Sequence, residues 1–164
     1  MVLIEKNNYK FSVDVEKTKD YYNTHSLCDC VCCRNYYEQI ANELPKLKEF
    51  LTDFGVDISK PDEIMSIEND GYIDYINVDY TVCGNIINSS EYEIDIYDNL
   101  FLNVIVTEGF ASPNEQTGDY FTLSVINISL PWVLDMPFPK KYKLKAENEK
   151  KNSLKKIIKK LLRK

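Results

Sequence analysis

The feature that most constrains the fold is a period-two alternation of apolar and polar residues that recurs between residues 63 and 130. Successive side chains of a β-strand point to opposite faces, so this period predicts strands with one buried face. One run has its apolar positions at Tyr72, Ile76, Val78, Tyr80 and Val82, with the polar Asp74 interrupting the series. Turn-forming residues separate the runs, which predicts that consecutive strands pair antiparallel.

The last alternating run, residues 120–130, changes phase along its length. Its apolar positions are first Phe121, Leu123 and Val125, and then Ile126, Ile128 and Leu130. A shift of this kind predicts either a β-bulge or a strand that is buried on both faces.

Two segments before residue 63 add further elements. Residues 9–16 alternate strictly and predict another half-buried strand, and polar residues follow as far as His25. Residues 32–54 have apolar positions at helical spacing, interrupted by Pro45. Proline is tolerated only in the first turn of a helix, so this segment predicts two helices or one sharply kinked helix, and Gly55 is a natural end.

Together these elements predict an α+β fold. We expect an antiparallel sheet of about five strands packed against an early helical pair. The body would be a single domain over residues 1–139. Residues 140–164 would form a basic linker followed by a C-terminal amphipathic helix.

The distribution of charge also changes at residue 140. Residues 140–164 carry twelve Lys or Arg and two acids, a net charge of +10, whereas the rest carries a net charge of −16. An acidic body repels nucleic acid and attracts basic partners, so we expect its partner to be another protein. Glu91, Glu93 and Asp95 would share one strand face and are the candidate partner-binding residues. The alternative is that they form an ordinary solvated face.

The basic tail has an apolar stripe. Its residues at helical spacing are Leu154, Ile157, Ile158, Leu161 and Leu162, and Ser153 precedes them as a predicted N-cap. Such a helix can dock on its own acidic body, on a second copy of the chain, or on an anionic membrane surface. Nucleic acid is a further alternative for the tail.

Four of the five cysteines lie within six residues, at positions 28, 30, 32 and 33, and the fifth is Cys83. Neighbours this close do not readily bridge one another, and a structural zinc ion takes four nitrogen or sulfur ligands. The candidate metal ligands for zinc are His25, Cys28, Cys30 and Cys33, with Cys83 as an alternative distant ligand. Two other interpretations stay open: cysteines packed as small apolar residues, and a reactive thiol at a helix N-terminus.

The run Cys28-x-Cys30-x2-Cys33-Arg34-Asn35-Tyr36, followed by residues 54–57 (Phe-Gly-Val-Asp) and by Leu130-Pro131-Trp132, resembles a family of small uncharacterised bacterial proteins. The resemblance covers roughly residues 9–139 and leaves the basic tail outside. It implies a shared domain and a bacterial source. No activity is established for that family, so the resemblance implies no chemistry.

The sequence lacks the common catalytic patterns. It has one histidine, no Gly-Lys-Ser/Thr phosphate loop and no Gly-x-Gly-x-x-Gly, and the zinc-protease pattern needs two histidines. The first residues do not resemble a signal peptide, and no apolar run reaches the ~20 residues of a membrane span. We therefore expect a non-enzymatic, cytoplasmic protein-binding or regulatory domain, comparable by charge and size to an immunity protein. The alternatives are a zinc- or thiol-dependent protein centred on residues 25–33, and peripheral membrane attachment through the tail.

Overall fold

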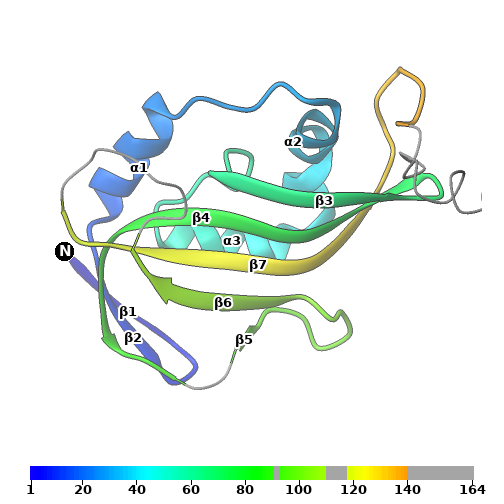
Figure 1. The fold of residues 1–164 in the computed structure, drawn as a ribbon. Helices are drawn as coiled ribbons and strands as arrows, with labels where there is room; N and C mark the ends of the chain where they lie inside the picture. Colours follow the sequence, from blue (N-terminus) through cyan, green and yellow to red (C-terminus); the bar gives the residue numbers. More distant parts are fainter. Residues whose placement is uncertain (91–92, 110–117, 140–164) are drawn as a thin grey trace, which may run out of the picture.

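The computed structural model describes residues 1–90, 93–109 and 118–139, and these form a mixed arrangement of helices and strands (Figure 1). The helices are α1 (Val15–Thr24), α2 (Val31–Glu43) and α3 (Pro45–Asp53). The strands are β1 (Val2–Lys6), β2 (Tyr9–Val13), β3 (Glu63–Asn69), β4 (Tyr72–Asn88), β5 (Ile94–Asp95), β6 (Asn103–Glu108) and β7 (Tyr120–Pro131). None of the helices in these ranges has the length and apolarity needed to cross a membrane.

All strand pairs are antiparallel, as the sequence predicts. The sheet order is β1-β2-β4-β7-β6-β5, and β3 also pairs with β4. At 17 residues, β4 is long enough to pair with β3 along its first half and with β2 at its end, while β7 lines its other side. The helices cover one face of this sheet (Figure 1), and we call that face the inner face.

The strand count corrects the expectation of about five, because the described residues contain seven. The two strands that were not counted, β1 and β3, lie at sheet edges, although β3 falls within the region 63–130 that was predicted as β. In β3 the exposed positions include Met65 and Ile67, whereas the half-buried positions include Ser66 and Glu68. Apolar residues thus fall on both faces of β3, which blurs its period. The predicted C-terminal helix lies outside the described residues.

The start of α1 is a second correction. We expected the first strand to extend to Glu16, but β2 ends at Val13 and a ten-residue helix begins at Val15. Asp14 caps this helix, because its carboxylate accepts a hydrogen bond from the Lys17 N–H at 3.1 Å. The cap ends the strand because Asp14 leaves the strand conformation to make this contact.

The pair α2 and α3 confirms the predicted break at Pro45. The proline occupies the first position of α3, where its missing N–H costs no helical hydrogen bond. Gly55 follows the end of α3 with a φ of 81°. A Cβ at this glycine would lie 2.5 Å from the carbonyl oxygen of Val15, so α3 ends where the chain passes closely over α1.

The core lies between the inner face and the helices. Its largest fully buried side chains include Tyr36 on α2, Phe54 after α3, and Tyr75, Tyr80 and Phe121 on the sheet. Buried tyrosines need partners for their hydroxyl groups. The core therefore holds an internal network of hydrogen bonds that fixes α2 on β4.

The predicted change of phase in β7 is present, and β4 has one at the facing position. The register between these two strands does not shift across it, so β7 has no bulge against β4. Against β3, by contrast, β4 does shift register, between Met65 and Ser66. Asn127 has a left-handed φ of 64°, and the core positions on either side of it, Val125 and Ile128, are three residues apart instead of two. In β4 the core positions Tyr75 and Val78 are also three apart. Tyr75 pairs with Ile128 and Asn77 with Ile126, so Ile76 and Asn127 stand opposite each other at the phase change.

Candidate metal centre

The cysteine cluster lies at the N-terminus of α2. Cys30 is the N-cap residue, with an extended backbone, and its Sγ accepts a hydrogen bond from the Cys33 N–H at 3.5 Å. This contact joins the cap to the third helical position, which is the usual capping geometry with sulfur in place of oxygen. The Cys-x2-Cys spacing therefore places both thiols at the same end of the helix.

Cys28 joins them from the extended segment that precedes the helix. The Sγ atoms of Cys28, Cys30 and Cys33 all lie within 4.8 Å of one another. Three sulfur atoms bound to one tetrahedral zinc ion at ~2.3 Å would be ~3.8 Å apart. A contraction of about 1 Å or less would therefore give the cluster three of the four ligands of a tetrahedral site, so these three thiols could hold a metal ion.

The three thiols differ in burial and acidity. Cys28 and Cys30 are exposed, and Cys33 is buried. Burial alone would raise the pKa of the Cys30 thiol, but hydrogen bonds from Cys33, Cys28 and the Cys32 N–H outweigh it and lower that pKa. Burial raises the pKa of the Cys33 thiol, and the neighbouring Cys30 and Cys28 raise it further. The Cys30 thiol is therefore more acidic than the Cys33 thiol.

Tyr37 lies beside the cluster, one turn after Cys33 on α2. Burial raises the pKa of its hydroxyl group, and the nearby thiols of Cys33, Cys28 and Cys30 raise it further. Sequence analysis did not single out Tyr37. The i, i+4 spacing from Cys33 is the signal that could have found it, because residues at that spacing share one helix face.

Cys32 points elsewhere, although it lies between two cluster residues. Burial raises the pKa of its thiol, and a hydrogen bond from Ser66 of β3 lowers it. The carbonyl oxygen of Cys32 accepts a hydrogen bond from the Tyr75 hydroxyl at 2.8 Å. Cys32 therefore belongs to the contact between α2 and the sheet, outside the three-thiol group.

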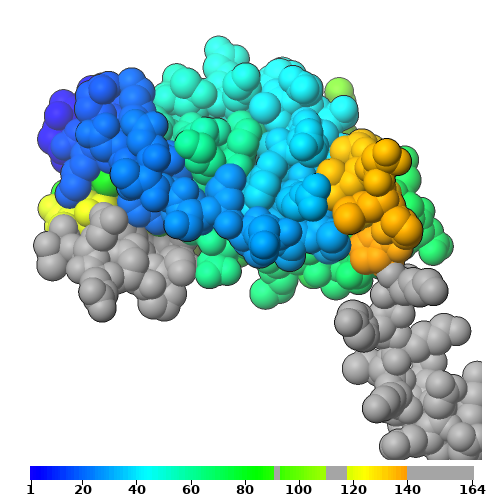
Figure 2. Space-filling view, turned by 90° about the horizontal axis from the view of Figure 1, so that it is seen from above, coloured from blue at the N-terminus to red at the C-terminus, as the bar shows by residue number. Residues whose placement is uncertain are grey.

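The cluster sits on a well-fixed helix. The fully buried Asn35 donates to the Tyr75 hydroxyl at 3.2 Å and to the Pro131 carbonyl at 3.1 Å, and its own Oδ1 accepts from the Val133 N–H at 2.9 Å. Gln39 also donates to the Pro131 carbonyl, at 2.9 Å. These bonds hold α2 between β4 and the segment 132–139, which lies against α2 in Figure 2. A helix fixed in this way limits how far its thiols can move.

His25, the fourth predicted ligand, lies apart from the thiols. It follows the end of α1, and its Nε2 is 3.2 Å from the Pro61 carbonyl oxygen. Its Nδ1 is 3.8 Å from a carboxylate oxygen of Asp62, which also accepts a hydrogen bond from the Tyr21 hydroxyl. Among the described residues, the group of ligand atoms within 4.8 Å contains the three cysteines and does not include His25.

Cys83, the alternative distant ligand, is buried against α1. Its backbone N–H donates to the Thr18 hydroxyl at 3.0 Å. Burial raises the pKa of its thiol, and hydrogen bonding to Thr18 and the charge of Lys17 lower it. It packs as a small apolar residue of the α1–β4 contact, which is the ordinary role considered for the cysteines.

The predicted partner-binding residues fall at the opposite end of the sheet. Glu93 and Asp95 are exposed, and Glu93 accepts a hydrogen bond from Asn103. Glu91 lies outside the described residues, as do the tail residues Leu154, Ile157, Ile158, Leu161 and Leu162. The structure therefore places only two of the three acids.

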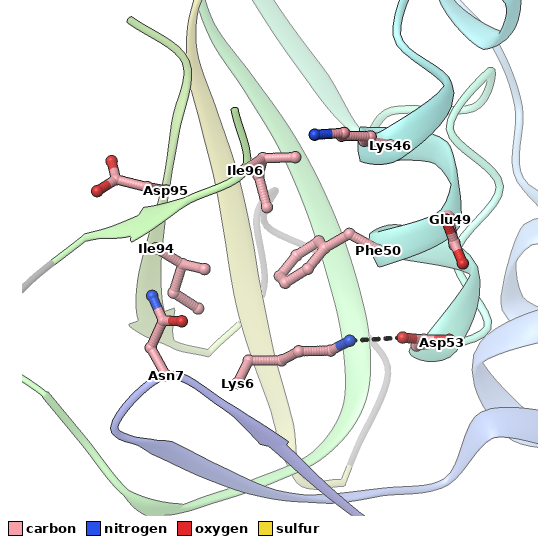
Figure 3. A pocket seen from close by; sticks show the side chains of 9 residues that line it. All are labelled: Lys6, Asn7, Lys46, Glu49, Phe50, Asp53, Ile94, Asp95 and Ile96. Atoms are coloured by element: carbon pink, nitrogen blue, oxygen red, sulfur yellow. Dashed lines mark hydrogen bonds and ion pairs between the residues drawn. The ribbon is translucent and has the colours of Figure 1, made fainter. Parts of the chain in front are cut away.

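Asp95 contributes to the rim of a hollow of ≈ 350 Å³ between the β1–β2 turn, α3 and β5 (Figure 3). Phe50, Ile94 and Ile96 form its apolar part. An ion pair of 2.6 Å between Lys6 and Asp53 crosses one side of it. The charges of Lys6 and Asp53 neutralise each other, and the hollow opens widely to solvent. The hollow is therefore a weaker candidate for a functional site than the thiol cluster.

Comparisons of the chain with protein-family models, with curated proteins and with solved structures gave no match.

Proposed function

We propose that the chain is a metal-binding domain in which Cys28, Cys30 and Cys33 hold one zinc ion through three thiolates. The observation that supports this most directly is the mutual approach of the three Sγ atoms within 4.8 Å. Three thiols rarely gather this closely for packing alone, since two of them, Cys28 and Cys30, are exposed and gain little from burial.

The donor set favours a thiophilic ion. Thiolates select zinc, copper(I) and iron–sulfur clusters over magnesium and calcium, which prefer oxygen. The N-terminus of α2 adds partial positive charge next to Cys30, which stabilises the thiolate form that a metal requires. Tyr37 lies close enough to Cys33 for its hydroxyl group to interact with that thiol.

The proposed site is open. A structural zinc site uses four protein ligands, whereas a site with three leaves a position for water or an exchangeable ligand. The exposure of Cys28 and Cys30 gives solvent access to that position. The domain would therefore bind zinc reversibly or present it to a ligand on another molecule. Such a zinc ion would not serve only to stabilise the fold.

The test is metal content and thiolate coordination of the full chain, purified without a histidine tag and under reducing conditions. We expect about one zinc ion per chain by mass spectrometry of metals. Replacement by cobalt(II) should give the intense sulfur-to-metal charge-transfer absorption of thiolate coordination. Cys30→Ser should abolish both signals, and it should leave α2 intact because serine is itself a favoured N-cap.

Cys32→Ser is the matched control. It changes the same chemical group two residues away, on a side chain that faces Ser66 and not the cluster. Equal loss of metal in both variants, or wild-type metal content in Cys30→Ser, would refute the proposal. Binding of copper(I) in place of zinc under the same conditions would reassign the ion and overturn the zinc assignment.

A further inference from the structure

Basic residues are absent from a long stretch of the sequence. Residues 61–139, which include β3 to β7, contain fourteen Asp or Glu and no Lys or Arg. Residues 140–164, immediately after them, contain twelve Lys or Arg. The acids of these five strands thus have no basic side chain within their own segment, and the nearest basic residues that follow are those of the tail.

The face of the sheet opposite the helices exposes apolar side chains. Met65 and Ile67 on β3 are 61% and 52% exposed, and Tyr72 and Ile76 on β4 are 51% and 42% exposed. The register brings them together, because Met65 pairs with Asn77, the neighbour of Ile76, and Ile67 pairs with Asp74. We call these four residues, with the acids Asp74 and Asp79 between them, the open face.

The acids of the open face are bound by neutral groups. Asp74 accepts hydrogen bonds from Asn69 at 3.0 Å and from Ser129 at 2.7 Å. Asp79 accepts from Asn77 at 2.8 Å and from Ser124 at 2.6 Å. These contacts fix the carboxylates in place and leave their negative charge uncompensated by those partners. A cation arriving from above the face would meet two oriented carboxylates among apolar side chains.

Strand β7 ends beside this face. Pro131 of β7 pairs with Tyr72, and the Trp132 N–H donates to the Gly71 carbonyl at 2.9 Å, at the β3–β4 turn. Residues 132–139 leave the sheet at that turn (Figure 1) and lie against α2 (Figure 2), so a tail that reaches the open face starts from the helix side of the sheet. Thirteen residues, 140–152, then precede the predicted helix. Fully extended they span at most ~45 Å, whereas the seven residues of β3 span only ~23 Å.

We propose that residues 153–164 dock on the open face of the same chain. The apolar stripe of the tail (Leu154, Ile157, Ile158, Leu161 and Leu162) would cover the four exposed apolar residues, and the flanking lysines would face Asp74 and Asp79. Apolar burial supplies most of the attraction, and the charges select the orientation. A linker longer than the distance to be crossed makes the contact within one chain easier than the same contact between two chains.

Hydrogen exchange of the full chain, followed by mass spectrometry, tests this. An isolated helix of about twelve residues is marginal in water, so slow exchange in residues 153–164 would report docking. We expect exchange there to be at least about tenfold slower in the wild type than in Ile67→Lys, which places a cation on the open face. The linker residues 140–152 should exchange rapidly in both proteins.

Leu3→Lys is the matched control. Leu3 is 61% exposed on β1, an edge strand that β2 separates from β4. Since Leu3 is outside the open face, the variant should keep the wild-type protection. Ile158→Glu changes only the tail and should lose the protection while the body still folds. This variant tests the docking of residues 153–164 even if Ile67→Lys fails to fold.

Three outcomes would overturn the proposal. The first is fast exchange of residues 153–164 in the wild type. The second is protection that rises with protein concentration together with a doubled mass by light scattering, which would assign the tail to a second copy. The third is protection that appears only with phosphatidylcholine vesicles containing phosphatidylglycerol, which would assign the tail to an anionic membrane.

Discussion

The hydroxyl oxygen of Tyr36 on α2 lies 2.6 Å from that of Tyr80 on β4, and both side chains are fully buried. Tyr80 also donates to the Ile58 carbonyl at 2.7 Å. Since the Tyr80 proton is committed to Ile58, Tyr36 must be the donor in the pair. The three groups form a directed chain that connects the helix, the sheet and the loop after α3.

This direction predicts unequal effects of two similar substitutions. Tyr80→Phe removes the acceptor of Tyr36 and the donor to Ile58, so it leaves two buried groups without partners and should cost about 2–4 kcal/mol. Tyr36→Phe removes only one donor and should cost about 1 kcal/mol. Urea denaturation of both variants measures the difference. A larger loss in Tyr36→Phe would mean that the chain of hydrogen bonds runs the other way.

Zinc should stabilise the folded protein through its cysteine cluster. At free zinc 100 times above the dissociation constant, binding adds ~2.7 kcal/mol, which corresponds to a rise of about 5–10 °C in Tm for a chain of this size. Thermal unfolding with and without zinc measures the shift. Cys33→Ser should show none, and Cys32→Ser should show the full rise. A rise in Cys33→Ser would place the metal elsewhere.

Alkaline pH should unfold the protein through its buried tyrosines. Burial raises the pKa of Tyr22, Tyr36, Tyr75 and Tyr80, whereas the same groups titrate near pH 10 in an unfolded chain. Their contribution is complete below pH 10 and is lost as the pH rises above it, because only the unfolded chain then releases the protons. Each group costs ~1.4 kcal/mol per pH unit, so the four together remove ~5 kcal/mol per unit, against a typical total of 5–15 kcal/mol.

The measurement is tyrosinate absorbance and circular dichroism in parallel pH titrations. Exposed tyrosines should ionise first, and the remaining absorbance should rise together with the loss of dichroism, one to two units above pH 10. Complete tyrosine ionisation in a protein that keeps its dichroism would contradict the assigned burial.

Asn127 should tolerate glycine and reject β-branched residues. Its φ of 64° lies in the left-handed region, where an ordinary side chain costs ~1–2 kcal/mol and a β-branched one costs more. Asn127→Val should therefore destabilise the protein by about 2 kcal/mol, whereas Asn127→Gly should stay within a few tenths. Ile126→Val, one residue earlier, controls for the presence of valine in the same strand, because isoleucine is already β-branched. Equal stability of the two Asn127 variants in urea would argue against the left-handed backbone at Asn127.

Much of the sheet could be predicted because the alternation in β4 and β7 reflects burial on one face. The change of phase in β7 could be predicted from the apolar positions on either side of Asn127, and the helical break from Pro45. By contrast, β1 was missed, and β3 was not counted as a separate strand within the predicted β region, because an edge strand buries less of its apolar surface on one face. Helix α1 was missed because most of its residues are polar. The sequence did contain a signal, because the N-cap residue Asp14 is followed by Thr18 and Tyr22, which are four residues apart and share the buried face of the helix.

The cysteine cluster shows which ligand positions can be predicted from the spacing of residues in the sequence and which cannot. The Cys-x2-Cys spacing at a helix start is local, so it correctly placed Cys30 and Cys33 together, and Cys28 followed through a single intervening residue. The position of His25 depends on where α1 ends and on the loop that carries Pro61 and Asp62. Those are contacts between distant parts of the chain, which no local spacing encodes.

The facing pair of Ile76 and Asn127 has a consequence for how this sequence can change in length. Removing either residue alone would shift one strand by a single position and send every side chain beyond it to the wrong side of the sheet. Removing both would keep the present register between β4 and β7 and would make the apolar–polar alternation of both strands continuous. The two positions therefore form a single unit of insertion or deletion, and related chains should have gained or lost them together.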